Sequence, residues 1–151
     1  MIQSYQEIIE TLATNASPIS FERDCIRTRS CNSCNGWLCH SQGSPLFKIL
    51  EGGKYEINFN TNVTSATAGL VAFGLYSDGV LIPGTTVITE ITTAGTYSNV
   101  SFTKVLPVCC RDNTTITVAS VPAVLSGVTP TSTATQVPII QNANLVIDRI
   151  S

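Results

Sequence analysis

The chain has 151 residues and a formal net charge of −2, which is enough for one domain with a hydrophobic core. Its 8 lysine and arginine residues are neither clustered with aromatic residues nor run together, so we expect no nucleic-acid partner. It has no run of about 18 apolar residues and no basic, apolar start, so we expect no membrane span and no secretory signal.

Charged residues make up only 12% of the chain, about half the usual share for a soluble domain. Threonine, serine and asparagine therefore supply most of the polar surface. This composition suits β-strands with hydroxyl-rich outer faces, and it suits proteins whose surface is partly covered by neighbours in an assembly.

The first stretch, residues 2–14, carries apolar residues at helical spacing. They are Ile2, Tyr5, Ile8, Ile9 and Leu12. The pattern predicts a short amphipathic helix of about three turns, which is marginal alone and has to lie on a surface. That surface could be its own β domain, a sister subunit or a foreign particle, and all three alternatives stay open.

Residues 25–40 hold four cysteines and the only histidine of the chain. They are Cys25, Cys31, Cys34, Cys39 and His40. Four of these side chains could hold a structural zinc in a reducing environment, whereas in an oxidising one the thiols would pair as disulfides or stay free. A catalytic Cys-His pair is not expected, because Cys39 and His40 are adjacent and would point to opposite sides of a strand. We therefore expect residues 1–44 to form a helix and a Cys-rich arm for attachment.

The stretch from residue 52 to residue 86 defines the β domain that follows. Tyr55, Ile57 and Phe59 alternate with polar residues, which predicts a strand with one wet face. Residues 70–76 are apolar or small at every position, so we expect that strand to be covered on both sides.

The doubly apolar strand predicts self-association. A sheet that buries one face in the core and is still apolar outside needs a second cover, most economically another copy of the chain. Closed symmetry is the norm, and a sandwich that presents one sheet to an axis suits a threefold ring. The residues expected at the trimer interface are Val71, Phe73, Leu75 and Tyr76.

The rest of the chain also has β patterns. Strands are predicted at residues 87–91, 100–105 and 115–119, and the last one, 143–150, is apolar enough to lie in the middle of a sheet. The Thr- and Pro-rich residues 127–135 are expected to form an exposed loop and a contact surface. About eight to ten short strands with no helix between them predict an antiparallel jelly-roll sandwich over residues 45–151.

Several segments share their pattern with one known family. They are Gly53-x-Tyr55-x-Ile57-x-Phe59, Leu70 to Tyr76, Asp78-Gly79, Pro83-Gly84-Thr85, Val100-Ser101-Phe102 and Ala143-x-Leu145-x-Ile147-x-x-Ile150. The pattern resembles the C1q and tumour-necrosis-factor-like jelly roll, which implies a compact trimer with a binding or structural role and no catalysis. It is similar in particular to the small versions of bacteria and their phages, which serve as head decoration proteins, fibre tips or spore-surface knobs.

These observations predict a structural function. We expect a trimeric capsid decoration or head-fibre protein of a bacteriophage, assembled in the bacterial cytoplasm and located on the virion surface. It would bind the major capsid protein through the apolar side chains of residues 2–12. The alternative is a trimeric knob that binds a receptor or a host-surface glycan through residues 127–135. An enzyme is not expected, because the chain has one histidine and no nucleophile or phosphate-loop motif.

Overall fold

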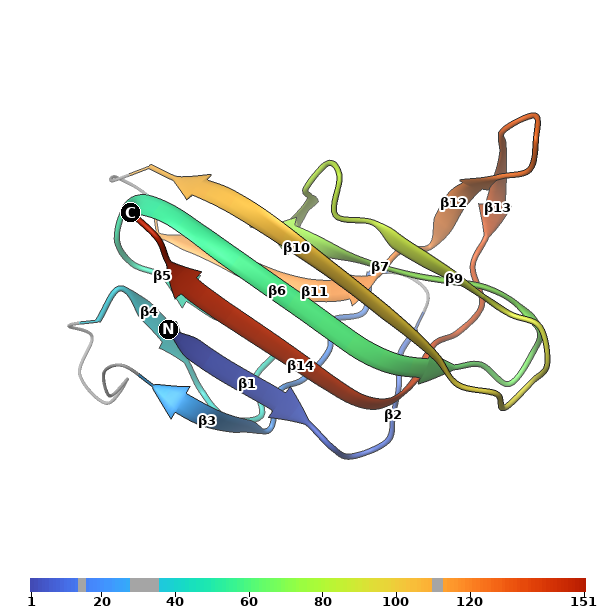
Figure 1. Ribbon diagram of the computed structural model, residues 1–151, viewed down its shortest axis with the longest axis horizontal. Coiled ribbons are helices and arrows are strands. Elements are labelled where there is room, and N and C mark those ends of the chain that lie inside the picture. The colour runs from blue at the N-terminus through green and yellow to red at the C-terminus, as the bar shows by residue number, and fades with distance from the viewer. Residues whose placement is uncertain (14–15, 28–35, 110–112) are drawn as a thin grey trace.

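The computed structural model describes residues 1–13, 16–27, 36–109 and 113–151, and every regular element in these ranges is a β-strand (Figure 1). The strands are β1 (Ile2–Gln6), β2 (Glu10–Thr11), β3 (Arg23–Arg27), β4 (Leu38–His40), β5 (Phe47–Ile49), β6 (Gly53–Thr64), β7 (Gly69–Ser77), β8 (Val80–Leu81), β9 (Val87–Ile91), β10 (Ser98–Val108), β11 (Thr114–Ser120), β12 (Ala123–Ser126), β13 (Thr131–Ala134) and β14 (Ile139–Arg149). Within the described ranges, no helix is long and apolar enough to cross a membrane.

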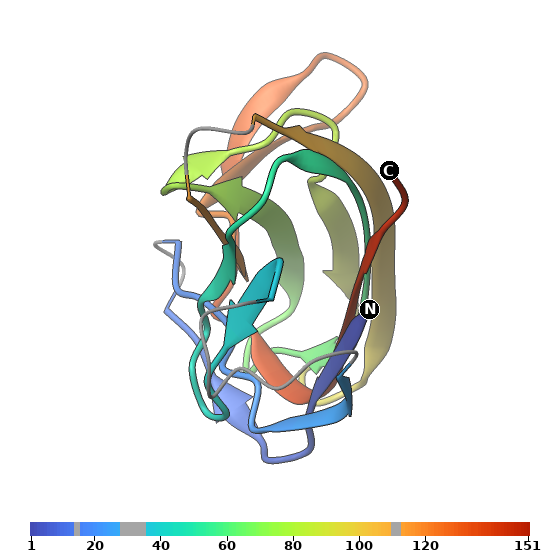
Figure 2. The same ribbon diagram turned by 90° about the vertical axis from the view of Figure 1, so that its left-hand side faces the viewer.

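Two antiparallel sheets face each other across the core, as the end-on view shows (Figure 2). Sheet A has the strand order β10-β6-β14-β1-β3, with β2 beside β14. Sheet B has the order β4-β5-β11-β7-β8, with β9 beside β7. The predicted antiparallel sandwich is therefore confirmed, and β14 lies in the middle of sheet A, as its apolar pattern indicated.

The alternation of β6 fills the core from sheet A. Phe59 pairs with Leu145 of β14, and its ring lies 6.1 Å from the ring of Phe73 in sheet B. Ile57 and Tyr55 point the same way and are fully buried. A strand of period two thus supplies one packed face and leaves its other face to solvent.

Both faces of β7 are buried, as predicted, but the second cover comes from the same chain. Val71 and Phe73 point into the core between the sheets. On the other face, Ala72 packs with Val121 and Val124 in a second apolar cluster. Because one chain covers this strand on both sides, the strand itself does not require a second copy.

The predicted N-terminal helix is wrong, because residues 2–6 form a strand between β14 and β3. Ile2, Ser4 and Gln6 point inward, so two of the three inward positions are polar and the strand alternation is hidden in the sequence. The Ser4 hydroxyl donates to Asp24, and the Gln6 amide donates to the carbonyl of Ile8. The Ser4 hydroxyl and the Gln6 Nε2 atom thereby gain partners, whereas the buried Gln6 Oε1 atom has none among the described residues.

The cysteine-rich segment also contributes to the sandwich. β3 pairs with β1 at one edge of sheet A, and β4 pairs with β5 at the edge of sheet B. The domain boundary expected at residue 44 therefore falls between two paired strands of one sheet.

A separate hairpin projects from the sandwich. It is formed by β12 and β13, which pair only with each other within the described ranges (Figure 1). Most of the loop expected at residues 127–135 forms the tip and second strand of this hairpin and is exposed.

Candidate functional site

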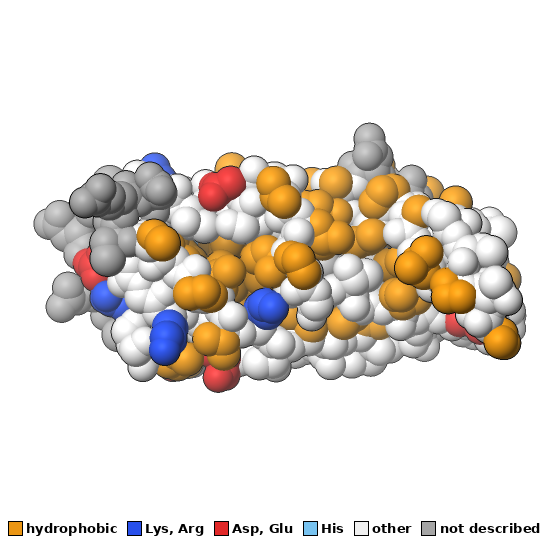
Figure 3. Space-filling model, turned by 90° about the horizontal axis from the view of Figure 1, so that it is seen from above, with side chains coloured by type: hydrophobic (Ala, Val, Ile, Leu, Met, Phe, Trp, Pro, Cys, Tyr) orange, Lys and Arg blue, Asp and Glu red, His pale blue; other side chains and the backbone are white. Residues whose placement is uncertain are grey.

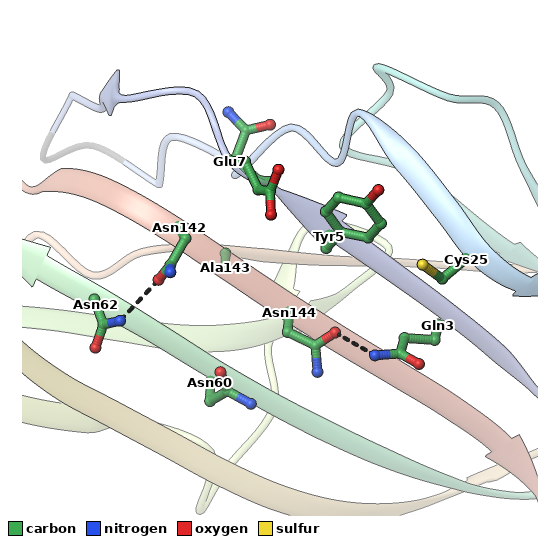
Figure 4. A pocket seen from close by; sticks show the side chains of 10 residues that line it. Gln3, Tyr5, Glu7, Cys25, Asn60, Asn62, Asn142, Ala143 and Asn144 are labelled. Carbon is green, nitrogen blue, oxygen red and sulfur yellow. Dashed lines mark hydrogen bonds between the residues drawn. The ribbon is translucent and has the colours of Figure 1, made fainter.

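A shallow groove runs over the outer face of sheet A, across β1, β14 and β6 (Figure 4). Its volume is about 460 Å³. Most of its lining side chains are polar and uncharged. The residues that line the groove are Gln3, Tyr5, Gln6, Glu7, Cys25, Asn60, Asn62, Asn142, Ala143 and Asn144. The size falls within the range of about 300–1,000 Å³ that is common for small-molecule sites.

Hydrogen bonds between strands hold several of these amides in place. The Nδ2 atom of Asn62 on β6 donates to Oδ1 of Asn142 on β14 at 2.9 Å (Figure 4). The Nε2 atom of Gln3 on β1 donates to Oδ1 of Asn144 on β14 at 3.1 Å. The amide groups of Asn142 and Asn144 are thereby oriented, and their Nδ2 atoms make none of the hydrogen bonds found among the described residues.

The groove is nearly without charge. Among the described residues that line it, Glu7 is the only charged one and none is a lysine or arginine; the exposed Arg23, which pairs with Tyr5 between β1 and β3, lies beside this lining. The ring of Tyr5 lies beside Cys25 at the β1 side of the groove, opposite Asn60 and Asn62 (Figure 4). The site can therefore exchange hydrogen bonds with a ligand, but its described lining has no cation with which to neutralise an anion.

The predicted zinc ligands are only partly within the described residues. Cys25 is exposed on β3, Cys39 is half-buried on β4 and His40 is buried, whereas Cys31 and Cys34 lie outside the described ranges. Among the residues that the structure describes, no three His, Cys, Asp or Glu side chains are grouped to hold a metal ion. The zinc site stays a prediction.

The His40 side chain is held by two hydrogen bonds instead. Its Nδ1 atom lies 2.8 Å from Oδ1 of Asp24, and its Nε2 atom lies 2.9 Å from the carbonyl oxygen of Ser44. Its ring is stacked on Phe47 with the centroids 4.0 Å apart. Both nitrogens already have acceptors, so this arrangement leaves neither of them facing an empty coordination position.

The expected attachment residues do not share one surface. Ile2 and Leu12 are buried in the core, and Tyr5 is half-buried in the groove. Ile8 and Ile9 lie in the connection between β1 and β2, and their exposed fractions are 59% and 62%. Only this pair remains open to a partner as an apolar contact.

The expected trimer interface is buried within one chain. Val71, Phe73 and Leu75 have no exposed surface, and Tyr76 is buried with its hydroxyl donating to the carbonyl of Ser120 at 3.2 Å. In this conformation a second copy has no access to these side chains. Self-association in this conformation therefore requires another surface.

Such a surface lies between β9 and β10, which are joined by the hydroxyl groups of Thr89 and Ser98 at 2.7 Å but, among the described residues, by no backbone pairing. β9 pairs only with β7 and β10 only with β6 in the described part of the chain. Four half-buried side chains pack against the core here: Ile82, Val87, Phe102 and Leu106. Figure 3 shows hydrophobic side chains gathered along this face, with few charges among them. We call these four residues the open edge.

Solved structures show what this fold is similar to. No protein-family model matches the sequence, and no curated protein matches it. The globular domain of zebrafish complement 1qA protein matches with a TM-score of 0.59 and 12% identity, covering 99% of this chain and 96% of that chain. Murine APRIL matches with a TM-score of 0.48 and 10% identity, covering 95% of this chain and 97% of that chain. The chain therefore has a C1q-like jelly-roll fold, as its sequence pattern indicated.

Proposed function

We propose that this chain is a non-catalytic module that assembles as a homotrimer and serves as a structural component on the surface of a bacteriophage capsid. The open edge is the observation that supports self-assembly. It exposes side chains that belong to the core at the unpaired edges of two strands, an arrangement that proteins usually cover.

The low charge of the open edge suits contact with another copy. Lys104 on β10, beside it, uses its Nζ atom to donate to the carbonyl of Pro83 at 3.1 Å. A cyclic assembly buries one such edge in every subunit without leaving an open end. The number three comes from the resemblance to the C1q and tumour-necrosis-factor-like family.

Assembly can be tested with substitutions beside the open edge. Ile88 on β9 and Val105 on β10 are exposed on the outer faces of the two strands that border the open edge, so the double variant Ile88→Asp/Val105→Asp should fold while placing a charge beside the contact on each strand. We expect the wild-type chain to be a trimer and this variant to be a monomer in light scattering. Val128→Asp, at the tip of the projecting hairpin, is the matched control and should remain a trimer. A wild-type monomer would refute the proposed assembly.

Attachment to the capsid would use Ile8 and Ile9. Two adjacent exposed isoleucines in one connection form an apolar contact that a partner can cover. The double variant Ile8→Ser/Ile9→Ser should lose co-sedimentation with empty capsids of the phage that encodes this chain. Ile150→Ser, another exposed isoleucine, should bind capsids like the wild type. Equal capsid binding by both variants, or no binding by the wild type, would refute this attachment.

A second candidate function is receptor binding by the projecting hairpin. The hairpin projects from the sandwich (Figure 1), and two of its apolar side chains are open to solvent, since Leu125 is 70% exposed and Val128 is fully exposed. A trimer that binds host cells but not capsids would favour this function. Loss of cell binding in the double variant Leu125→Ser/Val128→Ser would assign it to the hairpin.

A further inference from the structure

The groove on sheet A offers a ligand a fixed array of neutral hydrogen-bonding groups. Asn142 and Asn144 are oriented through their Oδ1 atoms by Asn62 and Gln3, which leaves their Nδ2 atoms available as donors. The Asn60 amide lies on β6, across from Asn144, and makes none of the hydrogen bonds found in the described part of the chain (Figure 4). An amide provides both donors and acceptors, which is what a row of hydroxyl groups requires.

The strands under the groove have no free backbone edge with which to bind a ligand. β14 is paired with β1 and β6, β1 is also paired with β3, and β6 with β10. All three strands under the groove therefore use their backbone groups within the sheet. A peptide could not add a strand here, so a ligand has to be recognised by side chains alone.

The charge of the groove lining disfavours an anionic ligand. Within its described lining, an anionic ligand would meet Glu7 and no lysine or arginine, and Arg23, opposite Tyr5, lies outside that lining. Recognition of phosphate, sulfate or carboxylate normally uses arginine, lysine or a helix N-terminus, and the described lining has none of these. The ligand that fits is neutral and rich in hydroxyl groups.

The Tyr5 ring supplies an apolar surface for the ligand. It is half-buried at the β1 side of the groove, where its face can pack against the C–H groups of a ring while its hydroxyl stays polar. One aromatic side chain beside several oriented amides suits a sugar, which has an apolar face and a polar rim.

We propose that the groove across β1, β14 and β6 binds a neutral oligosaccharide, with Asn60, Asn142 and Asn144 bonding its hydroxyl groups and Tyr5 packing against a sugar ring. This goes beyond the proposed assembly. It also places sugar binding on a different surface from the projecting hairpin.

The first test is a glycan array that carries neutral glucose-, galactose-, mannose- and N-acetylglucosamine-based oligosaccharides beside sialylated and sulfated ones. We expect binding to neutral glycans only. Titration of the strongest neutral oligosaccharide, followed by NMR, should give a dissociation constant on the order of 1 mM or tighter, as expected for an open polar site.

Substitutions then assign the binding to the groove. Asn60→Ala and Asn144→Ala should each weaken binding about fivefold, the effect of one neutral hydrogen bond. Asn58→Ala is the matched control, because Asn58 lies on the same face of β6 but does not line the groove. It should bind the oligosaccharide like the wild type. Val128→Ser, in the hairpin, should also leave the affinity unchanged.

Each other outcome refutes the inference. No neutral binding, binding to anionic glycans or peptides alone, or an affinity that Asn60→Ala and Asn144→Ala leave unchanged would overturn it. Light scattering on the same samples separates this result from the proposed assembly. A trimer without sugar binding refutes only the groove, and a monomer that binds sugar refutes only the trimer.

Discussion

The Nδ1 atom of His40 lies 2.8 Å from the Oδ1 atom of Asp24, and both side chains are fully buried. The Nε2 atom of His40 faces a second acceptor, the carbonyl oxygen of Ser44 at 2.9 Å. Both ring nitrogens of His40 are therefore held by fixed oxygen atoms, one from a side chain and one from the backbone. Asp24 lies on β3 in sheet A and His40 on β4 in sheet B, so the pair joins the edges of the two sheets.

This pair should contribute strongly to stability. His40→Ala removes one hydrogen-bond partner of the buried Asp24 side chain and the ring that stacks on Phe47, and we expect a loss of about 2–4 kcal/mol in the free energy of unfolding. Urea denaturation measures the loss. Lys48→Ala, an exposed position on the neighbouring strand β5, should change stability by less than about 0.5 kcal/mol. A His40→Ala variant as stable as the Lys48→Ala variant would contradict this role.

The Thr85 hydroxyl group should contribute to the stability of the folded chain. It accepts from the backbone nitrogen of Leu75 at 3.0 Å and donates to the carbonyl of Ile82 at 2.7 Å. Thr85→Val keeps the shape but leaves both buried backbone groups unpaired, at a cost of about 1–3 kcal/mol. Thermal denaturation should show this loss and almost none for Thr103→Val on the exposed face of β10. Equal melting temperatures for the two variants would show that the hydroxyl is dispensable.

Two valines in the hairpin region test the intrachain cover of β7. Val124 is buried against Ala72 and Val121, whereas Val128 is fully exposed. Val124→Ala should therefore cost about 1–2 kcal/mol in unfolding free energy, because it removes buried methyl groups from the outer face of β7. Val128→Ala should leave stability unchanged. If both variants were equally stable, the hairpin would not be packed on β7.

Glu10 should make stability depend on pH. Burial raises the pKa of its carboxyl group above the ordinary value of 4.5, and hydrogen bonds from Ser20 oppose that rise only partly. The folded state then holds the proton more tightly than the unfolded state, so this contribution to stability is full below pH 4.5 and is lost as the pH rises through the folded pKa. Glu10→Gln should show a smaller fall in melting temperature from pH 4 to pH 7 than the wild type. An unchanged pH profile would contradict this assignment.

Much of the sandwich can be predicted from the sequence because its central strands are regular. Tyr55, Ile57 and Phe59 alternate strictly, and the apolar β14 lies mid-sheet as expected. The double burial of β7 was also correctly predicted. What the sequence could not indicate is that Val121 and Val124, some 50 residues further along, cover its second face.

The N-terminal strand could not be predicted from periodicity. Its inward positions include Ser4 and Gln6, which resemble exposed residues until Asp24 and Glu10 are found beside them. The apolar residues Ile8 and Ile9 completed a helical pattern, yet they lie in an exposed connection. Tertiary pairing with β14 outweighed the local spacing here.

The groove could not be predicted for a similar reason. Asn58, Asn60 and Asn62 show in the sequence only as the polar face of one strand. Their relation to Asn142 and Asn144 arises when β14 pairs with β6 across about 80 residues of chain. Sheet order, rather than local pattern, makes this surface.

The central claim is that the open edge is covered by other copies of the chain. The most direct test is the molar mass in solution, measured by light scattering over a range of concentrations up to the order of 100 μM. We predict a mass close to three times the 16.1 kDa of one chain, and a mass close to one chain for Ile88→Asp/Val105→Asp. A wild-type mass that stays at one chain over the whole range would contradict the claim.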